Sequence, residues 1–186
     1  MPYPTDLAPQ HLVTLPRASI GALRAALLRD AGPGYASYLQ EAGYAGGETI
    51  FEAFRAWLAG RGADAPESLP IEAFAAQAGA FFADTGWGRL EVTPRHDVAA
   101  IVDAADWAEA DPEAHLDHPG CHFTTGLLAD FFGRVASSPL AVLEVECRSS
   151  GGERCRFVAG SAEVMQHVYE RIAAGSGYDE AIDEIA

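Results

Sequence analysis

The sequence predicts an α+β fold, in which N-terminal helices precede an antiparallel sheet and one more helix is inserted before a C-terminal hairpin. Two observations carry this prediction. Apolar residues recur at helical spacing through the first 86 residues, whereas β-branched segments separated by turns begin at Trp87. The length of 186 residues suits one domain, or one domain with an appended helical segment.

The first half is predicted to be mostly helical after an irregular lead-in at 1–16 that holds four prolines. Ser19 is the predicted N-cap of the first helix, and Gly-Pro-Gly at 32–34 ends it. A second, short helix is predicted to end at the Gly-Gly pair 46–47. The predicted helices of this half are 19–30, 35–44, 48–62 and 71–86.

The second half is predicted to hold two hairpins with a helix between them. Pro139 is expected to stop that helix, and Ser-Ser-Gly-Gly at 149–152 marks the turn of the second hairpin. Strands are predicted at 88–94, 97–107, 139–147 and 154–160, and helices at 121–138, 161–175 and, short or frayed, 178–186. The predicted units are the lead-in 1–16, a helical segment 17–86, a core 87–175 and a tail helix 176–186.

Charge and composition exclude several classes of function. The net charge is −15, and all twelve basic residues are arginine, so lysine Schiff-base chemistry and a P-loop lysine are excluded. Nucleic acid and anionic membrane surfaces are unsuitable partners for so acidic a chain. The N-terminus has no signal-peptide pattern, and no stretch has the ~20 apolar residues of a membrane span, so we expect a cytoplasmic protein.

The three cysteines form a candidate metal site together with one glutamate. Cys147 and Cys155 lie on opposite arms of the second hairpin, Cys121 starts the helix before it, and Glu144 precedes Cys147 by three residues. Residues three apart in a regular strand face opposite sides, so a shared site requires a bulge or a strand end near Glu146. Three thiolates and a carboxylate would make the closed shell typical of structural zinc. The alternative is that the thiols simply fill the core.

The segments "HPGCHFTTGLLADFFG" and "LAVLEVECRSSGGERCRF" resemble the 4-vinyl reductase domain family and are similar in layout to the aromatic-sensing domains of phenol- and xylene-responsive activators. The resemblance covers roughly residues 85–160. It implies a structural zinc held by Cys121, Glu144, Cys147 and Cys155, a fold of the same kind, and homodimers formed through the N-terminal helices. The apolar segment "IFEAFRAWL" at 50–58 would suit that dimer interface.

The resemblance also implies an apolar pocket for a small hydrophobic or aromatic molecule beside the zinc. It nominates Trp107, Thr125, Phe131 and Val142 as lining residues, although each of the aromatic residues could equally be ordinary core. A histidine that would anchor a ligand hydroxyl has no counterpart here. The prediction is therefore a stand-alone sensor-like binding domain. The alternatives are an enzyme or accessory protein of tetrapyrrole metabolism and an assembly module.

Other patterns are less specific. His115, His118 and His122 cluster near Cys121 and could contribute to a Cys–His metal site, or could belong to a solvated acidic loop. A Cys–His nucleophile would need an orienting group and a cleft that nothing in the sequence marks. None of the glycine-rich stretches follows a strand and opens a helix as a dinucleotide-binding site requires. The sequence thus favours a binding module over an enzyme.

Overall fold

The computed structural model describes residues 12–186 and confirms the α+β class, with helices and one antiparallel sheet. Its helices are α1 (Arg17–Ala31), α2 (Tyr35–Ala59), α3 (Ile71–Asp84), α4 (His122–Val135), α5 (Ala162–Ala173) and α6 (Tyr178–Asp183). Its strands are β1 (Glu91–Arg95), β2 (Ala99–Ala104), β3 (Ala141–Glu146) and β4 (Cys155–Gly160). Most of the lead-in predicted at 1–16 lies outside the described residues. None of the helices in the described part of the chain has the length and apolar character needed to cross a bilayer.

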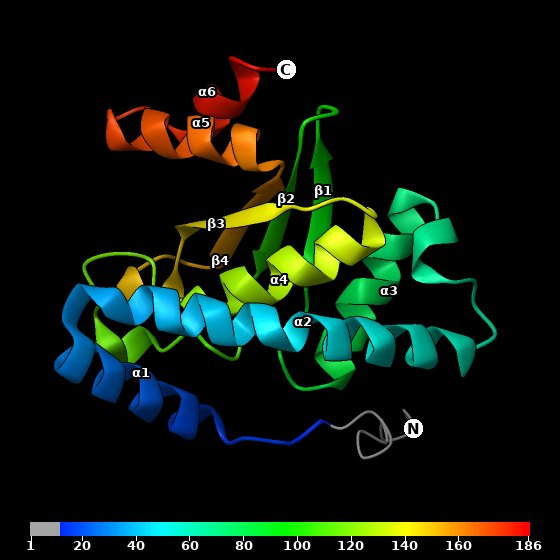
Figure 1. Cartoon of the computed structure of the whole chain (residues 1–186), viewed down its shortest axis with the longest axis horizontal. Helices are drawn as coiled ribbons and strands as arrows, with labels where there is room; N and C mark the ends of the chain where they lie inside the picture. The colour runs from blue at the N-terminus through cyan, green and yellow to red at the C-terminus, as the bar shows by residue number, and fades with distance from the viewer. Residues whose placement is uncertain (1–11) are drawn as a thin grey trace.

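The sheet has the order β1-β2-β4-β3, and the three strand pairs are all antiparallel. The second hairpin therefore inserts β4 beside β2. Helices α2, α3 and α4 pack on one face, α5 and α6 cover the other, and α1 lies outside α2 (Figure 1). Alternate residues serve the two layers: Val102 faces the larger core and Ile101 the smaller one.

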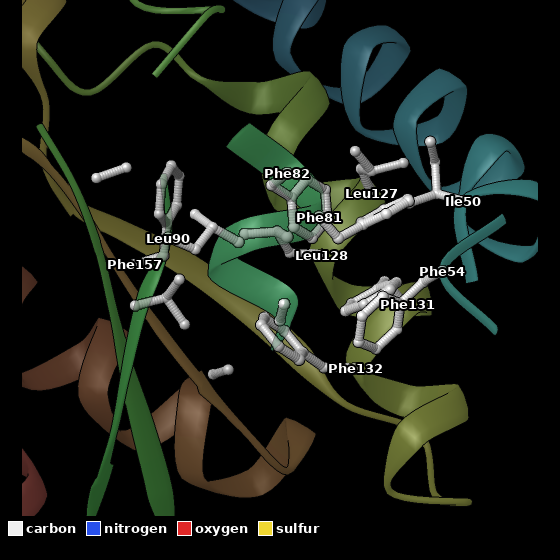
Figure 2. Packing of buried hydrophobic residues seen from close by; sticks show 14 of the residues in the cluster. Ile50, Phe54, Phe81, Phe82, Leu90, Leu127, Leu128, Phe131, Phe132 and Phe157 are labelled. Carbon is white, nitrogen blue, oxygen red and sulfur yellow. The ribbon is translucent and has the colours of Figure 1, made fainter. Parts of the chain in front are cut away.

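The larger core is rich in aromatic side chains. Phe81 and Phe82 of α3 meet Phe131 of α4 and Phe54 of α2, and Phe157 of β4 closes the sheet side (Figure 2). All five side chains are fully buried. The helical segment 17–86 and the following region thus share one hydrophobic core.

The prediction of two helices at 35–44 and 48–62 is wrong, because α2 runs without interruption through Gly46 and Gly47. Gly47 serves the contact with α4 rather than a helix end. A Cβ atom on Gly47 would lie 2.5 Å from side-chain atoms of Asp130 in α4. Tertiary packing that requires a small residue therefore overrides the low helix propensity of glycine.

Two predicted caps have different outcomes. Ser19 lies inside α1, whose N-cap is Pro16, so that prediction is wrong. Ser161 caps α5 as its pattern indicates, with its hydroxyl oxygen accepting a hydrogen bond from the Val164 amide at 3.2 Å. The C-terminal segment forms a short helix, α6, which packs on the smaller core through Ala181 and Ile182.

The segment predicted to form a dimer interface lies inside the chain's own core. Ile50, Phe51, Phe54, Trp57 and Leu58 are all buried without a second copy. Dimerisation therefore stays a prediction, and this apolar face gives it no support.

Candidate metal centre

Four side chains converge where α4 begins and the second hairpin turns. One ligand atom from each of Cys121, Glu144, Cys147 and Cys155 lies within 4.8 Å of every other, and all four residues are buried. Cys121 is the N-cap residue of α4, Glu144 and Cys147 come from the end of β3, and Cys155 starts β4. The cluster thus joins three elements that are separate in the sequence.

An irregularity in β3 places Glu144 and Cys147 on one side, as their spacing requires. Glu144 pairs with Phe157 and Glu146 with Arg156, so the register shifts between Glu144 and Glu146. After Cys147 the chain turns through a short 3₁₀ helix that ends at Gly151, whose φ of 90° favours glycine. The amide of Ser149 in this turn donates to Cys147 Sγ at 3.3 Å.

The sulfur spacing fits a tetrahedral ion. Cys121 Sγ lies 3.8 Å from both Cys147 Sγ and Cys155 Sγ. Zinc–sulfur bonds of about 2.3 Å at tetrahedral angles place sulfur atoms about 3.8 Å apart. A disulfide would bring two of these atoms to about 2.05 Å, so the cysteines are free thiols here.

Glu144 supplies the strongest sign of a missing positive charge. Its Oε2 accepts a hydrogen bond from the Cys121 amide at 2.7 Å, but its buried Oε1 has no partner among the described residues. Burial, followed by the charge of Cys147, raises the pKa of Glu144 to about 9. Hydrogen bonds from Cys121 and Cys155 hold the pKa of Cys147 well below its usual range. Four acidic groups crowded in this way fit a bound cation, which would stabilise all of them as anions.

The histidines near Cys121 are not part of this cluster. His115 and His118 lie outside it, and the half-buried His122 has its Nε2 3.1 Å from the Tyr35 hydroxyl. Among residues 12–186, the group of three cysteines and Glu144 is the one arrangement of metal-ligating side chains this close together.

A second polar cluster, which the sequence did not indicate, holds α4 in place. Glu109 is buried, and its carboxylate accepts hydrogen bonds from the amides of Phe123 at 3.0 Å and Thr124 at 2.8 Å. The Thr124 hydroxyl donates to Glu109 at 2.5 Å and accepts from Trp107 Nε1 at 2.6 Å. Glu109 thus satisfies the free amides at the start of the helix that follows Cys121. The only sequence signal was an acid in the loop before that helix, which by itself indicated nothing.

Replacing Glu109 with glutamine should flatten the pH dependence of stability. Burial raises the pKa of Glu109 from 4.5 to about 7, although its hydrogen bonds to Thr124 and Phe123 oppose the shift. The folded protein therefore binds the proton more tightly than the unfolded chain does, so this contribution is fully present below pH 4.5 and is lost as pH rises through about 7. The slope is at most about 1.4 kcal/mol per pH unit. Urea unfolding from about pH 5 to pH 8 should show a smaller decline in Glu109→Gln than in wild type.

The exposed neighbour Glu113 provides the control for that experiment. Glu113→Gln should keep the wild-type pH profile, because its carboxylate is in water. Equal slopes for wild type and Glu109→Gln would contradict the assignment.

The structure brings two of the four predicted pocket residues into the aromatic core. The ring of Phe82 contacts both Trp107 and Phe131, at centroid distances of 5.7 and 5.3 Å. Val142 packs against the same core from β3. Thr125 points to α2, where its hydroxyl oxygen accepts from Gln40 Nε2 at 3.3 Å. Two surface hollows, of about 340 and 280 Å³, are lined by none of these four residues.

Comparison with known proteins supports the sequence resemblance. Residues 104–161 match the model of the 4-vinyl reductase domain family. An uncharacterized protein of Methanocaldococcus jannaschii is 27% identical over 77 residues, which is 41% of each chain, so the match spans less than half of that relative.

Three solved structures share the fold at low sequence identity. The phenol-responsive sensory domain of the transcription activator PoxR, solved with phenol, has a TM-score of 0.65 at 16% identity, and the match covers 82% of this chain and 77% of that one. A vinyl-4-reductase family protein from Methanocaldococcus jannaschii has a TM-score of 0.53 at 18% identity, covering 86% and 97%. A trafficking protein particle complex subunit 3 from Naegleria fowleri, covalently bound to palmitic acid, has a TM-score of 0.60 at 13% identity, covering 77% and 91%. The predicted family is thus confirmed: the chain carries a 4-vinyl reductase domain, matched at residues 104–161.

Proposed function

We propose that this protein is a sensor-like domain that binds a small hydrophobic or aromatic molecule, and that Cys121, Glu144, Cys147 and Cys155 hold a structural zinc ion. The observation that carries the proposal is the closed, buried set of four donors next to an aromatic core. Three thiolates and one carboxylate leave no open position for water, so the ion would supply cross-linking rather than catalysis. The fold shared with the phenol-responsive domain of PoxR supports the sensory part.

The proposed ligand position is the aromatic core between α4 and the sheet. Trp107, Phe131 and Val142 contribute to it, and Thr125 lies on the α2 side of the same helix. The metal centre fixes the start of α4 and the second hairpin, and these elements carry Phe131 and Val142. Zinc would therefore hold the two walls of the ligand site in a constant relative position. The side chains fill this space in the structure, so a ligand has to displace some of them (Figure 2).

A thermal-shift screen with aromatics, terpenoids and fatty acids tests the binding proposal. A ligand at 100 times its dissociation constant should stabilise the fold by about 2.7 kcal/mol, which is roughly 5–10 °C for a chain of this size. Phe131→Leu should tighten binding of a benzene-sized ligand, because the shorter side chain opens space in the core.

Val168→Ala is the matched control, since Val168 is fully buried in the smaller core on the other side of the sheet. It should lower stability without changing ligand affinity. The absence of any shift at millimolar concentrations, in wild type and in Phe131→Leu, would contradict the proposed binding function.

An assembly module is the second candidate, because the trafficking-particle subunit shares the fold and because the aromatic core is tightly packed. For that function the ligand screen would be negative and a protein partner would be required. The tetrapyrrole alternative is tested in the same screen by divinyl protochlorophyllide and haem, whose Soret bands shift on binding.

A further inference from the structure

The most enclosed unassigned space in the described part of the chain lies between α1 and the segment 108–111. This hollow has a volume of about 340 Å³, at the lower end of the range of ligand sites. Its walls are small residues: Ala18, Gly21 and Ala22 from α1, and Ala108 and Ala110 from the facing segment. It lies outside the aromatic core, so it is distinct from the ligand site of the proposed function.

Arg24 keeps α1 at a distance from this segment. Its guanidinium is buried, donates from Nη1 to the Glu109 carbonyl at 3.0 Å and lies 3.6 Å from the Asp111 carboxylate. It is the only buried residue of α1. The helix is therefore attached mainly by a polar contact, and the small residues beside that contact leave space unfilled.

Arg17 supplies the uncompensated charge at the hollow. Its Nη1 and Nη2 lie 3.4 Å from the carbonyl oxygens of Asp106 and Gly86, which are long contacts to neutral acceptors. Within residues 12–186, no carboxylate lies within ion-pair distance of it. The acids of the lining are already engaged: Asp111 faces Arg24, and the Glu109 carboxylate points into the start of α4.

We propose that this hollow binds a small organic monocarboxylate, with its hydrocarbon part between the alanine walls and its carboxylate on Arg17. A guanidinium binds a carboxylate through two parallel charge-assisted hydrogen bonds, which are shorter and stronger than the present carbonyl contacts. The low volume restricts the ligand to a single ring or a short chain. Binding would also tie α1 to the body of the protein, because the ligand touches both sides of the hollow.

Titration of the full chain with benzoate and hexanoate, followed by calorimetry and amide NMR, tests this site. Benzoate should bind saturably with a dissociation constant on the order of 1 mM or lower, shift the amides of 17–24 and 108–111, and slow hydrogen exchange in α1. Neutral benzamide should bind at least about tenfold more weakly, since it lacks the charge that Arg17 recognises.

Three variants complete the experiment. Arg17→Gln should weaken benzoate binding at least about tenfold, whereas Arg29→Gln, on the same helix but paired with Asp30, should not. Gly21→Leu should also abolish binding by filling the hollow. A Cβ atom there has its nearest contact at 3.6 Å, so the variant is expected to fold.

Three results would overturn the site: no saturable shift at concentrations on the order of 10 mM, equal affinity for benzamide, or equal losses in Arg17→Gln and Arg29→Gln. Because the ligand of the proposed function is uncharged and lies in the aromatic core, either proposal can fail while the other stands.

Discussion

Replacing Gly43 with alanine should destabilise the protein severely, whereas the same change at Gly46 should not. Helices α2 and α4 pack closely, and Gly43 lies directly against the backbone of α4. A Cβ atom on Gly43 would lie 1.9 Å from the Phe123 carbonyl oxygen and 2.9 Å from the Leu127 amide nitrogen. Backbone atoms cannot rotate away as a side chain can, so the two helices would have to separate.

We expect Gly43→Ala to cost about 3 kcal/mol or more of unfolding free energy, which lowers the melting temperature by roughly 10 °C. Because Phe123 follows Cys121 by two residues, the shift should also loosen metal binding. Gly46 is the matched control: on the same helix, its nearest Cβ contact is a side-chain atom of Leu127 at 3.7 Å. Gly46→Ala should be neutral or stabilise by up to about 1 kcal/mol through helix propensity. Equal melting temperatures for the two variants, measured calorimetrically, would contradict this packing.

Replacing Glu144 with glutamine should lower stability and metal affinity together, and the sign of the effect is informative. If no cation binds, this substitution removes a buried carboxylate oxygen that has no partner, and stability should rise. If zinc is bound, the substitution removes one of its four ligands, and we expect a loss of several kcal/mol. Calorimetry of metal-loaded protein distinguishes the two outcomes.

Glu146→Gln is the control for this experiment, two residues along the same strand. The Glu146 carboxylate is partly exposed and pairs with Arg154 and Arg156 away from the cysteines. Its replacement should cost no more than about 1 kcal/mol and leave metal content unchanged. Cys147→Ser should follow Glu144→Gln, and a chelator should reduce the wild type to the stability of the two site variants.

The sequence predicted those features that depend on local pattern. The four candidate ligands, the bulge that brings Glu144 and Cys147 together, and the Ser161 cap follow from spacing and residue type. The continuous α2 did not, because whether Gly-Gly ends a helix or allows a second helix to approach depends on α4, a distant part of the chain.

Features created by contacts between distant segments were equally invisible in the sequence. Glu109 has its role only because its loop passes the start of α4, and Arg24 only because α1 lies beside that loop. The face at 50–58 has the pattern of a dimer surface because an apolar helix face looks the same whether it meets a second copy or the chain's own core.

The most direct test of the metal centre is elemental analysis of protein purified with its thiols reduced and without added metal. We predict about one zinc per chain in wild type and Glu146→Gln, and a strongly reduced content in Glu144→Gln and Cys147→Ser. Wild-type protein that is folded, fully reduced and free of zinc and other transition metals would contradict the proposed metal centre.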